Sequence, residues 1–77
     1  MQTNTVEDLT SLRKRSVSIA GHQTSVSMEE AFWQRLKFIS KYHGKSINQL
    51  VTEIDKQRTG NLSSALRVFI LSQTNTK

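Results

Sequence analysis

The sequence predicts a mainly α-helical domain that carries a short β ribbon and assembles as a homodimer. Residues 16–28 alternate between polar and apolar side chains, as strands do, and helical periodicity begins at Glu29. The chain has only 77 residues, of which 35% are hydrophobic, and it contains no cysteine. Because so small a chain buries little surface and has no disulfide to stabilise it, we expect a second copy to complete the core.

The strand region contains two short phases of alternation, whose apolar residues stand at positions of opposite parity. They are Val17 and Ile19 in the first phase and Thr24, Val26 and Met28 in the second. A hairpin with a two-residue type II′ turn at Gly21-His22 brings both phases to one face, because it pairs Val17 with Val26. The alternative is a single strand over residues 23–28, preceded by a free arm. The pattern leaves both arrangements open.

Three helical segments follow the strand region. Ser27 is the expected N-cap of the first helix and Gly44 its left-handed stop, and Ser46 is the expected N-cap of the second. A third helix over residues 62–72 is apolar on almost every side, which is typical of a helix buried against a partner. The residues expected in the core are Val26, Leu36, Ile39, Val51 and Ile54.

The predicted domain covers residues 16–72, between a flexible tail with a basic arm at 1–15 and a disordered tail at 73–77. A lone central strand would expose its backbone N–H and C=O groups and invite pairing. Antiparallel pairing of residues 23–28 with the same strand of a second chain satisfies these groups around a twofold axis. We therefore expect a homodimer with an intermolecular ribbon, widened by an N-terminal strand if the hairpin forms.

Residues 23–58 resemble the ribbon–helix–helix family of bacterial and phage regulators. The shared features are an alternating strand, a helix, and the turn Gly44-Lys45-Ser46-Ile47-Asn48 that opens an aliphatic second helix. Residues 13–33 and 60–71 are in addition similar to a subgroup of short bacterial proteins built on this domain. The resemblance covers about three quarters of the chain and implies a sequence-specific transcriptional regulator of the repressor type.

The resemblance also implies which residues meet double-stranded DNA. In the family, outward-facing strand residues read base edges in the major groove, and the matching positions here are Gln23, Ser25 and Ser27. Backbone phosphates would lie at the N-terminus of the second helix, at Ser46, Ile47 and Asn48. Charge adds Lys45 and the basic tract Arg13-Lys14-Arg15 as phosphate contacts. Each of these residues could instead be an ordinary solvated or capping residue.

The charge of the chain agrees with a nucleic-acid partner. Eleven Lys and Arg residues against six Asp and Glu residues give a net charge of +5, which favours a polyanion, with DNA ahead of an anionic membrane. No apolar run approaches the roughly 18 residues of a membrane span, and no signal peptide is apparent. We expect a protein of the bacterial cytoplasm that has no membrane partner.

Catalytic and metal-binding motifs are missing from the sequence. His22 and His43 stand alone without a second ligand at metal-binding spacing, so both are expected to be structural. The chain has no nucleophile motif, no phosphate-binding loop and no Cys/His couple. The sequence therefore predicts a protein that is not an enzyme and uses no cofactor.

Two alternative functions remain. One is an antitoxin whose tail folds on a toxin, although only about six residues follow the third helix. The other is a protein-interaction module that keeps the fold without binding DNA. It is favoured by the strand's outer face, which lacks the Lys or Arg of many relatives. Sheet width bears on the docking mode. A dimer of hairpins has four strands and a major groove about 12 Å wide admits a two-stranded ribbon, so the outer strands would have to peel away or pack elsewhere.

Overall fold

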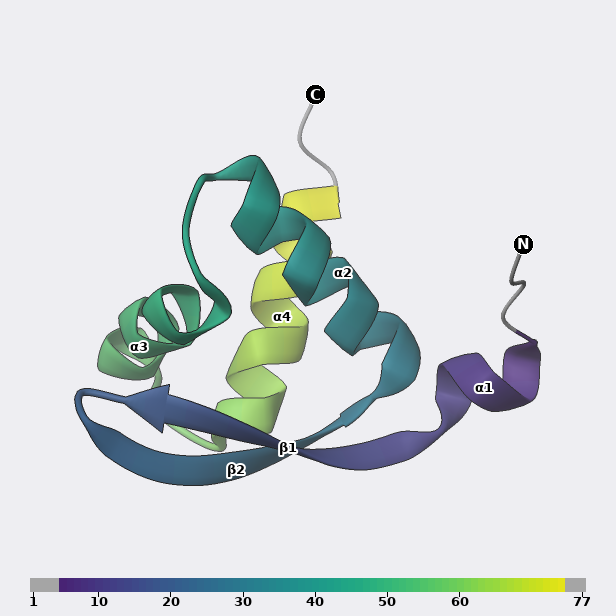
Figure 1. Ribbon diagram of the computed structural model, residues 1–77, viewed down its shortest axis with the longest axis horizontal. Helices are drawn as coiled ribbons and strands as arrows, with labels where there is room; N and C mark the ends of the chain where they lie inside the picture. Colours follow the sequence, from purple (N-terminus) through teal and green to yellow (C-terminus); the bar gives the residue numbers. More distant parts are fainter. Residues whose placement is uncertain (1–4, 75–77) are drawn as a thin grey trace.

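A β-hairpin forms the base of the molecule, and three helices cover one of its faces (Figure 1). A computed structural model describes residues 5–74 of the chain. Its elements are α1 (Val6–Thr10), β1 (Leu12–Ile19), β2 (His22–Glu29), α2 (Glu30–Tyr42), α3 (Ile47–Gln57) and α4 (Leu62–Thr74). The hairpin and the three helices that follow it agree with the predicted fold class.

The hairpin turns at Ala20-Gly21, so the predicted turn at Gly21-His22 is wrong. Both turn residues have positive φ, 52° at Ala20 and 85° at Gly21, as a type I′ turn requires and a type II′ turn does not. Val17 consequently pairs with Thr24 and not with Val26. The shift of two residues keeps every side chain on its predicted face, and it lets the ladder continue as far as the pair Leu12–Glu29.

Residues 5–15 are ordered, which corrects the prediction of a flexible tail up to residue 15. Thr5 and Asp8 form a capping box that starts α1, and the basic tract lies within β1. Three consecutive cations hide the strand period in the sequence, but the long aliphatic stem of arginine can occupy an inward strand position. Residues 75–77 of the predicted C-terminal tail lie outside the described residues, whereas Gln73 and Thr74 belong to α4.

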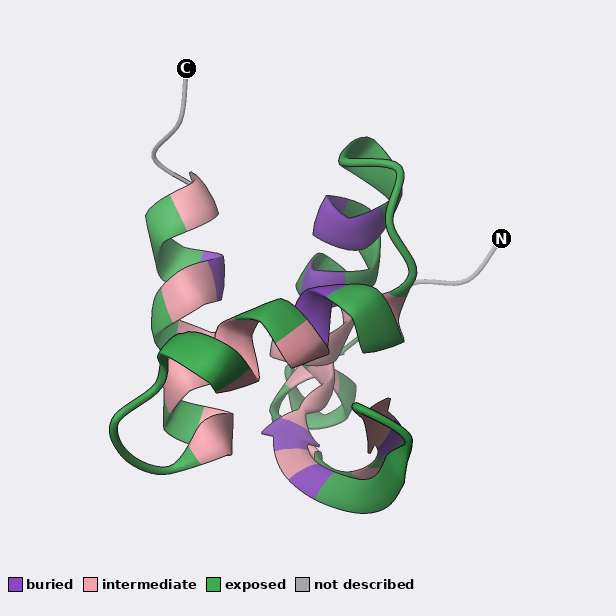
Figure 2. Ribbon diagram, turned by 90° about the vertical axis from the view of Figure 1, so that its left-hand side faces the viewer, coloured by how far each residue is buried: buried purple, intermediate pink, exposed green. Residues whose placement is uncertain are grey.

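The core lies between the inner face of the hairpin and the three larger helices, where the buried sides of the elements face one another (Figure 2). Its buried apolar residues are Val17, Val26, Met28, Leu36, Ile39, Leu50, Val51, Leu66 and Ile70. The burial predicted for Val26, Leu36, Ile39 and Val51 is confirmed, but Ile54 is only half-buried. Leu66 and Ile70 come from α4, so this helix supplies core that the sequence had assigned to a second copy.

The helix boundaries follow the caps, with one correction. Ser27 lies inside β2 and caps nothing, because the N-cap of α2 is Glu29, which makes no side-chain cap hydrogen bond. Gly44, with φ of 69°, provides the left-handed backbone after α2. Ser46 caps α3 as predicted. Since only residues 43–46 separate α2 from α3, the two helices turn sharply, and α3 packs along β1.

Candidate nucleic-acid interface

The outer face of the hairpin, turned away from the helices, is polar along both strands. Strand alternation places the buried residues Val17, Val26 and Met28 inward. The outward positions near the turn, hereafter the outer face, are Lys14, Ser16 and Ser18 of β1 with Gln23, Ser25 and Ser27 of β2, and the last outward pair of the ladder is Leu12–Glu29. Gln23 and Ser25 are exposed, and Ser27 is half-buried. The residues predicted to read bases therefore share one face, and none of the six outer-face residues is acidic.

Lys14 supplies the cation that β2 lacks. It stands directly opposite Ser27 in the ladder, on the same outer face, and is exposed. The absence of Lys and Arg from β2 had argued against DNA binding. Strand β1 thus places a positive side chain beside the residues of β2 that are predicted to read bases. This position depends on the pairing of the two strands and is not apparent from the sequence of β2 alone.

The outer edge of β2 is open for pairing. The backbone N–H of Ser18 donates to Asn48 Oδ1 at 3.0 Å, so Ser18 and its partner Gln23 do not exchange backbone bonds with each other. Because such pairs alternate along an antiparallel ladder, the backbone groups of Ser25 and Ser27 also point away from β1. The described sheet contains only β1 and β2, which leaves that side of β2 without a neighbouring strand.

Arg15 has a structural role and is turned inward. Its guanidinium forms an ion pair with Glu30 and lies 5.0 Å from the ring centroid of Trp33. Its Nε is buried and makes no hydrogen bond within the described residues. The side-chain hydrogen bond from Gln34, followed by the charge of Arg15, lowers the pKa of Glu30. Of the basic tract, Arg13 and Lys14 remain exposed, and Arg15 joins β1 to α2.

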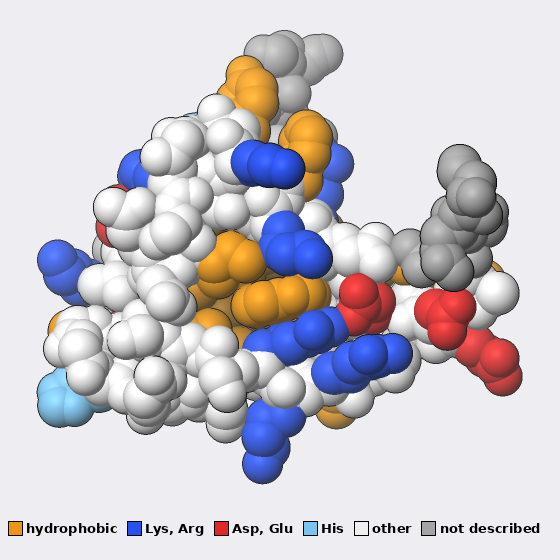
Figure 3. All heavy atoms as spheres, in the orientation of Figure 1, with side chains coloured by type: hydrophobic (Ala, Val, Ile, Leu, Met, Phe, Trp, Pro, Cys, Tyr) orange, Lys and Arg blue, Asp and Glu red, His pale blue; other side chains and the backbone are white. Residues whose placement is uncertain are grey.

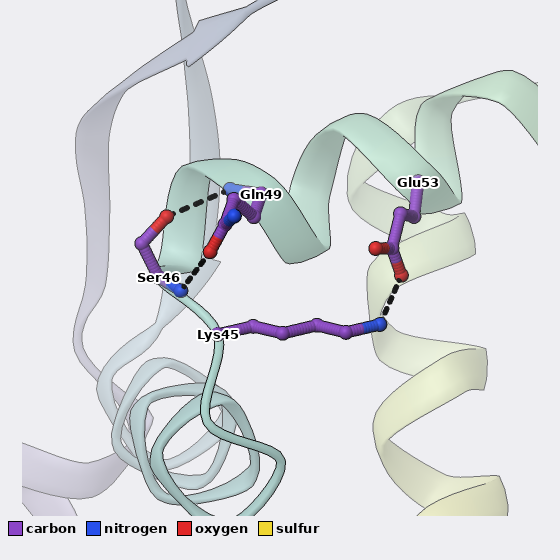
Figure 4. A network of polar contacts seen from close by, with 4 residues as sticks. All are labelled: Lys45, Ser46, Gln49 and Glu53. Carbon is purple, nitrogen blue, oxygen red and sulfur yellow. Dashed lines mark hydrogen bonds and ion pairs between the residues drawn. The ribbon is translucent and has the colours of Figure 1, made fainter.

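The N-terminus of α3 is strongly capped (Figure 4). Ser46 Oγ accepts from the N–H of Gln49 at 3.0 Å, and Gln49 Oε1 accepts from the N–H of Ser46 at 2.8 Å. Lys45 Nζ lies 2.7 Å from Glu53 Oε1 on the exposed side of the helix. The predicted phosphate contacts at Lys45 and Ser46 are thus close together, but each side chain already has a partner.

Asn48 and Ile47 have roles that the sequence did not reveal. The Asn48 side chain binds the backbone of β1, and Ile47 packs half-buried against the core. Their backbone N–H groups lie in the first turn of α3, where no intrahelical acceptor exists. A phosphate at this end would therefore meet backbone donors, as the helix dipole favours.

Lys and Arg side chains gather on the face shown in Figure 3, beside an apolar hollow and close to a group of acidic side chains. One ion pair joins the end of β2 to α4, since Arg67 Nε lies 2.9 Å from Glu29 Oε1. Hydrogen bonding by Arg67 lowers the pKa of Glu29. Arg15 and Arg67 are thus partly neutralised by acidic partners, whereas Lys14 has no ion pair within residues 5–74.

The arrangement of a strand followed by two helices joined at a tight turn is that of a ribbon–helix–helix protein. The model of the ribbon-helix-helix domain matches residues 12–74, and the chain belongs to that family. The family consists generally of DNA-binding regulators or antitoxins that usually dimerise, and its fold is not typically enzymatic.

A solved structure has the same fold. An uncharacterized protein from Bordetella pertussis Tohama I superposes with a TM-score of 0.76 at 28% identity, covering 91% of this chain. The aligned region is 61% of that protein, so the present chain spans about three fifths of its length. No curated protein matches this sequence significantly.

Across residues 5–74, no helix combines the length and apolar character needed to cross a membrane. The same residues bring no three His, Asp or Glu side chains into a cluster that could hold a metal ion.

Proposed function

We propose that this protein is a sequence-specific DNA-binding transcriptional regulator that acts as a homodimer. The observation that carries the proposal is the outer face of the hairpin, which is polar from Ser18–Gln23 to Lys14–Ser27, with Lys14 as its charged residue; Glu29 follows only in the last pair of the ladder. The open edge of β2 beside it supports antiparallel pairing with a second copy. Such a dimer would occupy a promoter in the bacterial cytoplasm and repress transcription.

The width of the paired sheet defines how it meets the duplex. Four strands spaced about 4.8 Å apart span about 14 Å between the outer strands. A major groove about 12 Å wide therefore receives the two central β2 strands, while the β1 strands lie over the groove walls. In this arrangement Gln23 and Ser25 face base edges, and Lys14 faces a phosphate. Ser27 is half-buried and lies opposite Lys14, so its side chain extends the least toward the bases.

Phosphate contacts at the flanks complete the proposed interface. The backbone N–H groups of Ile47 and Asn48 lie in the first turn of α3, next to the side chains of Lys45 and Ser46. A phosphate there would compete with Glu53 for Lys45. Arg13 adds an exposed cation at the far end of β1.

Selection of bound sequences from a random duplex pool, followed by gel shift, tests the proposal. We expect a twofold-symmetric site and an affinity that falls steeply as salt concentration rises. Hydroxyl-radical footprinting should show protection on both walls of one major groove. Failure to select any sequence, together with salt-independent or absent binding, would refute the proposed function.

The second candidate is a protein-interaction module without DNA binding. It is favoured by the same sheet width, because short serine side chains reach little beyond a four-stranded surface. In that case the purified protein would retard no duplex at any salt concentration. An antitoxin role stays a further prediction, tested by asking whether a small neighbouring gene encodes a toxin that the protein neutralises.

A further inference from the structure

Helix α4 exposes apolar side chains on the side opposite the core. It buries Leu66 and Ile70, yet Val68 is 66% exposed and Leu71 is 55% exposed. A helix at the surface of a small domain ordinarily carries polar residues on its outer side. We call Val68 and Leu71 the α4 ridge.

A groove runs beside the α4 ridge, between the end of α3 and the first turns of α4. Its volume is about 490 Å³, and its apolar lining includes Ile54, Ala65, Val68 and Phe69. The half-burial of Ile54, which had been expected in the core, is thus explained by its position at this groove. The ridge and the groove share α4, so two antiparallel copies of α4 can place each ridge against the other's groove.

The low net charge of this face favours a second copy of the chain as the occupant of the groove. A twofold contact sets each patch against itself, so any net charge in the patch repels its own image. Across the described span of α4, Arg67 is the single charged residue, and it is turned toward Glu29 at 2.9 Å. Arg58 beside the groove lies 2.6 Å from Asp55 and also bonds the carbonyl of Gly60. In a chain of net charge +5, this face is one on which two copies can meet without repulsion.

We propose that the α4 ridge docks into the groove between α3 and α4 of a second copy, around a twofold axis. The contact uses none of the residues on the open edge of β2. A chain with two self-complementary surfaces assembles beyond a dimer, so the protein would form particles of four chains. The α4 contact goes beyond the proposed DNA binding, and the count of four rests on the β2 pairing assumed there.

Particle mass, measured by sedimentation and light scattering over micromolar concentrations, tests the proposal. We expect four chains per particle for the wild type and two for Val68→Lys, which places a charge on the twofold contact. Val6→Lys is the matched control, because Val6 is 77% exposed and lies on α1, and it should leave four chains. Circular dichroism should show that both variants keep the wild-type helix content.

A second variant separates the two surfaces. The N–H of Ser25 points away from β1, so Ser25→Pro removes a donor that only a second chain would use. Ser25→Pro alone should leave two chains joined through α4, and Ser25→Pro combined with Val68→Lys should leave single chains. If Val68→Lys by itself yields single chains, the α4 ridge belongs to the same dimer as β2 and the proposal of a second contact is wrong.

Cross-linking gives a test that does not depend on a disruptive charge. The chain has no cysteine, so Val68→Cys introduces a unique thiol on the ridge, at the residue closer to the first turns of α4. A short bismaleimide should link Val68→Cys into covalent pairs, whereas Leu12→Cys on β1, at a residue 60% exposed, should stay unlinked. Equal linking of the two variants would overturn the proposal.

The outcomes distinguish this proposal from the proposed function. A wild type of two chains that Val68→Lys leaves at two chains overturns the α4 contact and leaves DNA binding untouched. A four-chain particle that retards no duplex supports the α4 contact and refutes DNA binding. Where both hold, Val68→Lys should bind a duplex with a single site as tightly as the wild type, per pair of chains.

Discussion

The two strands of the hairpin are equal in length and differ in what lies along their outer edges. The edge of β1 is covered by α3, with Asn48 bound to the N–H of Ser18. The edge of β2 is open and carries no Lys or Arg between His22 and Glu29. Like charges opposite each other destabilise a strand pair, so a strand that pairs with its own copy benefits from being neutral. In the proposed function, this division would place the DNA-binding charge on β1 and the pairing with a second copy on β2.

The contrast between an inner and an outward position of the ladder provides the largest test of this comparison. Met28 of β2 is fully buried, and Met28→Ala should lower the free energy of unfolding by about 2–5 kcal/mol. Leu12 at the start of β1 is 60% exposed, so Leu12→Ala should change it by less than about 0.5 kcal/mol. Urea unfolding measures both. Similar costs at the two positions would contradict the assigned inner face.

The outer faces separate base reading from phosphate binding. Gln23→Ala on β2 should reduce the preference for the selected site over random DNA by about 1–3 kcal/mol, with an unchanged salt slope. Lys14→Ala on β1 should weaken binding to every duplex and flatten the slope of log affinity against log salt by about 0.9 per chain.

Arg15→Met serves as the control within the basic tract. Because Arg15 is turned toward Glu30 and Trp33, its loss should leave the salt slope unchanged. A slope change as large as that of Lys14→Ala would mean that Arg15 reaches the DNA.

The closed edge of β1 depends on one side-chain acceptor. Asn48→Ala removes the partner of the Ser18 N–H and should cost about 0.5–1.5 kcal/mol. Asn48→Asp keeps an acceptor oxygen and should retain most of that stability. Amide hydrogen exchange should accelerate at Ser18 in Asn48→Ala and stay slow in Asn48→Asp. Unchanged exchange in both variants would show that α3 protects this edge by packing alone.

The smallest expected effect concerns acid stability at the end of β2. Arg67 lowers the folded-state pKa of Glu29 below its ordinary value of 4.5, so the ion pair contributes stability that is fully present above 4.5. That contribution is lost as pH falls through the folded-state pKa. Between about pH 5 and pH 3, the range over which carboxylates titrate, the melting temperature of Glu29→Gln should therefore fall less than that of the wild type. An identical decline would exclude Glu29 as a source of acid sensitivity.

Much of the fold was predictable because its signals are local. Several signals depend on residues close together in the chain: the helical periodicity of α2, the Ser46 cap, the left-handed Gly44 and the all-round apolar character of α4. The hairpin was predictable as one of two alternatives. Its register was not predictable, because alanine rarely adopts the left-handed conformation that Ala20 has here.

The candidate site was predictable in composition and less so in geometry. Gln23, Ser25 and Ser27 lie on the predicted face, since strand parity fixes it. Lys14 faces outward and Arg15 inward because neighbouring residues of a strand alternate between its faces. The sequence did not show this, because the three consecutive cations hide where the strand begins. Asn48 matched a turn motif, but its bond to Ser18 joins positions 30 residues apart, which local patterns do not encode.

The guanidinium of Arg15 over Trp33 gives the protein a built-in optical reporter. Trp33 is the single tryptophan of the chain, and it stands where β1 meets α2. Its fluorescence should change when the strand leaves the helix, because the ring would lose a cation and gain water. Stopped-flow emission could therefore follow the docking of β1 in real time, without a label, in every variant that retains both residues.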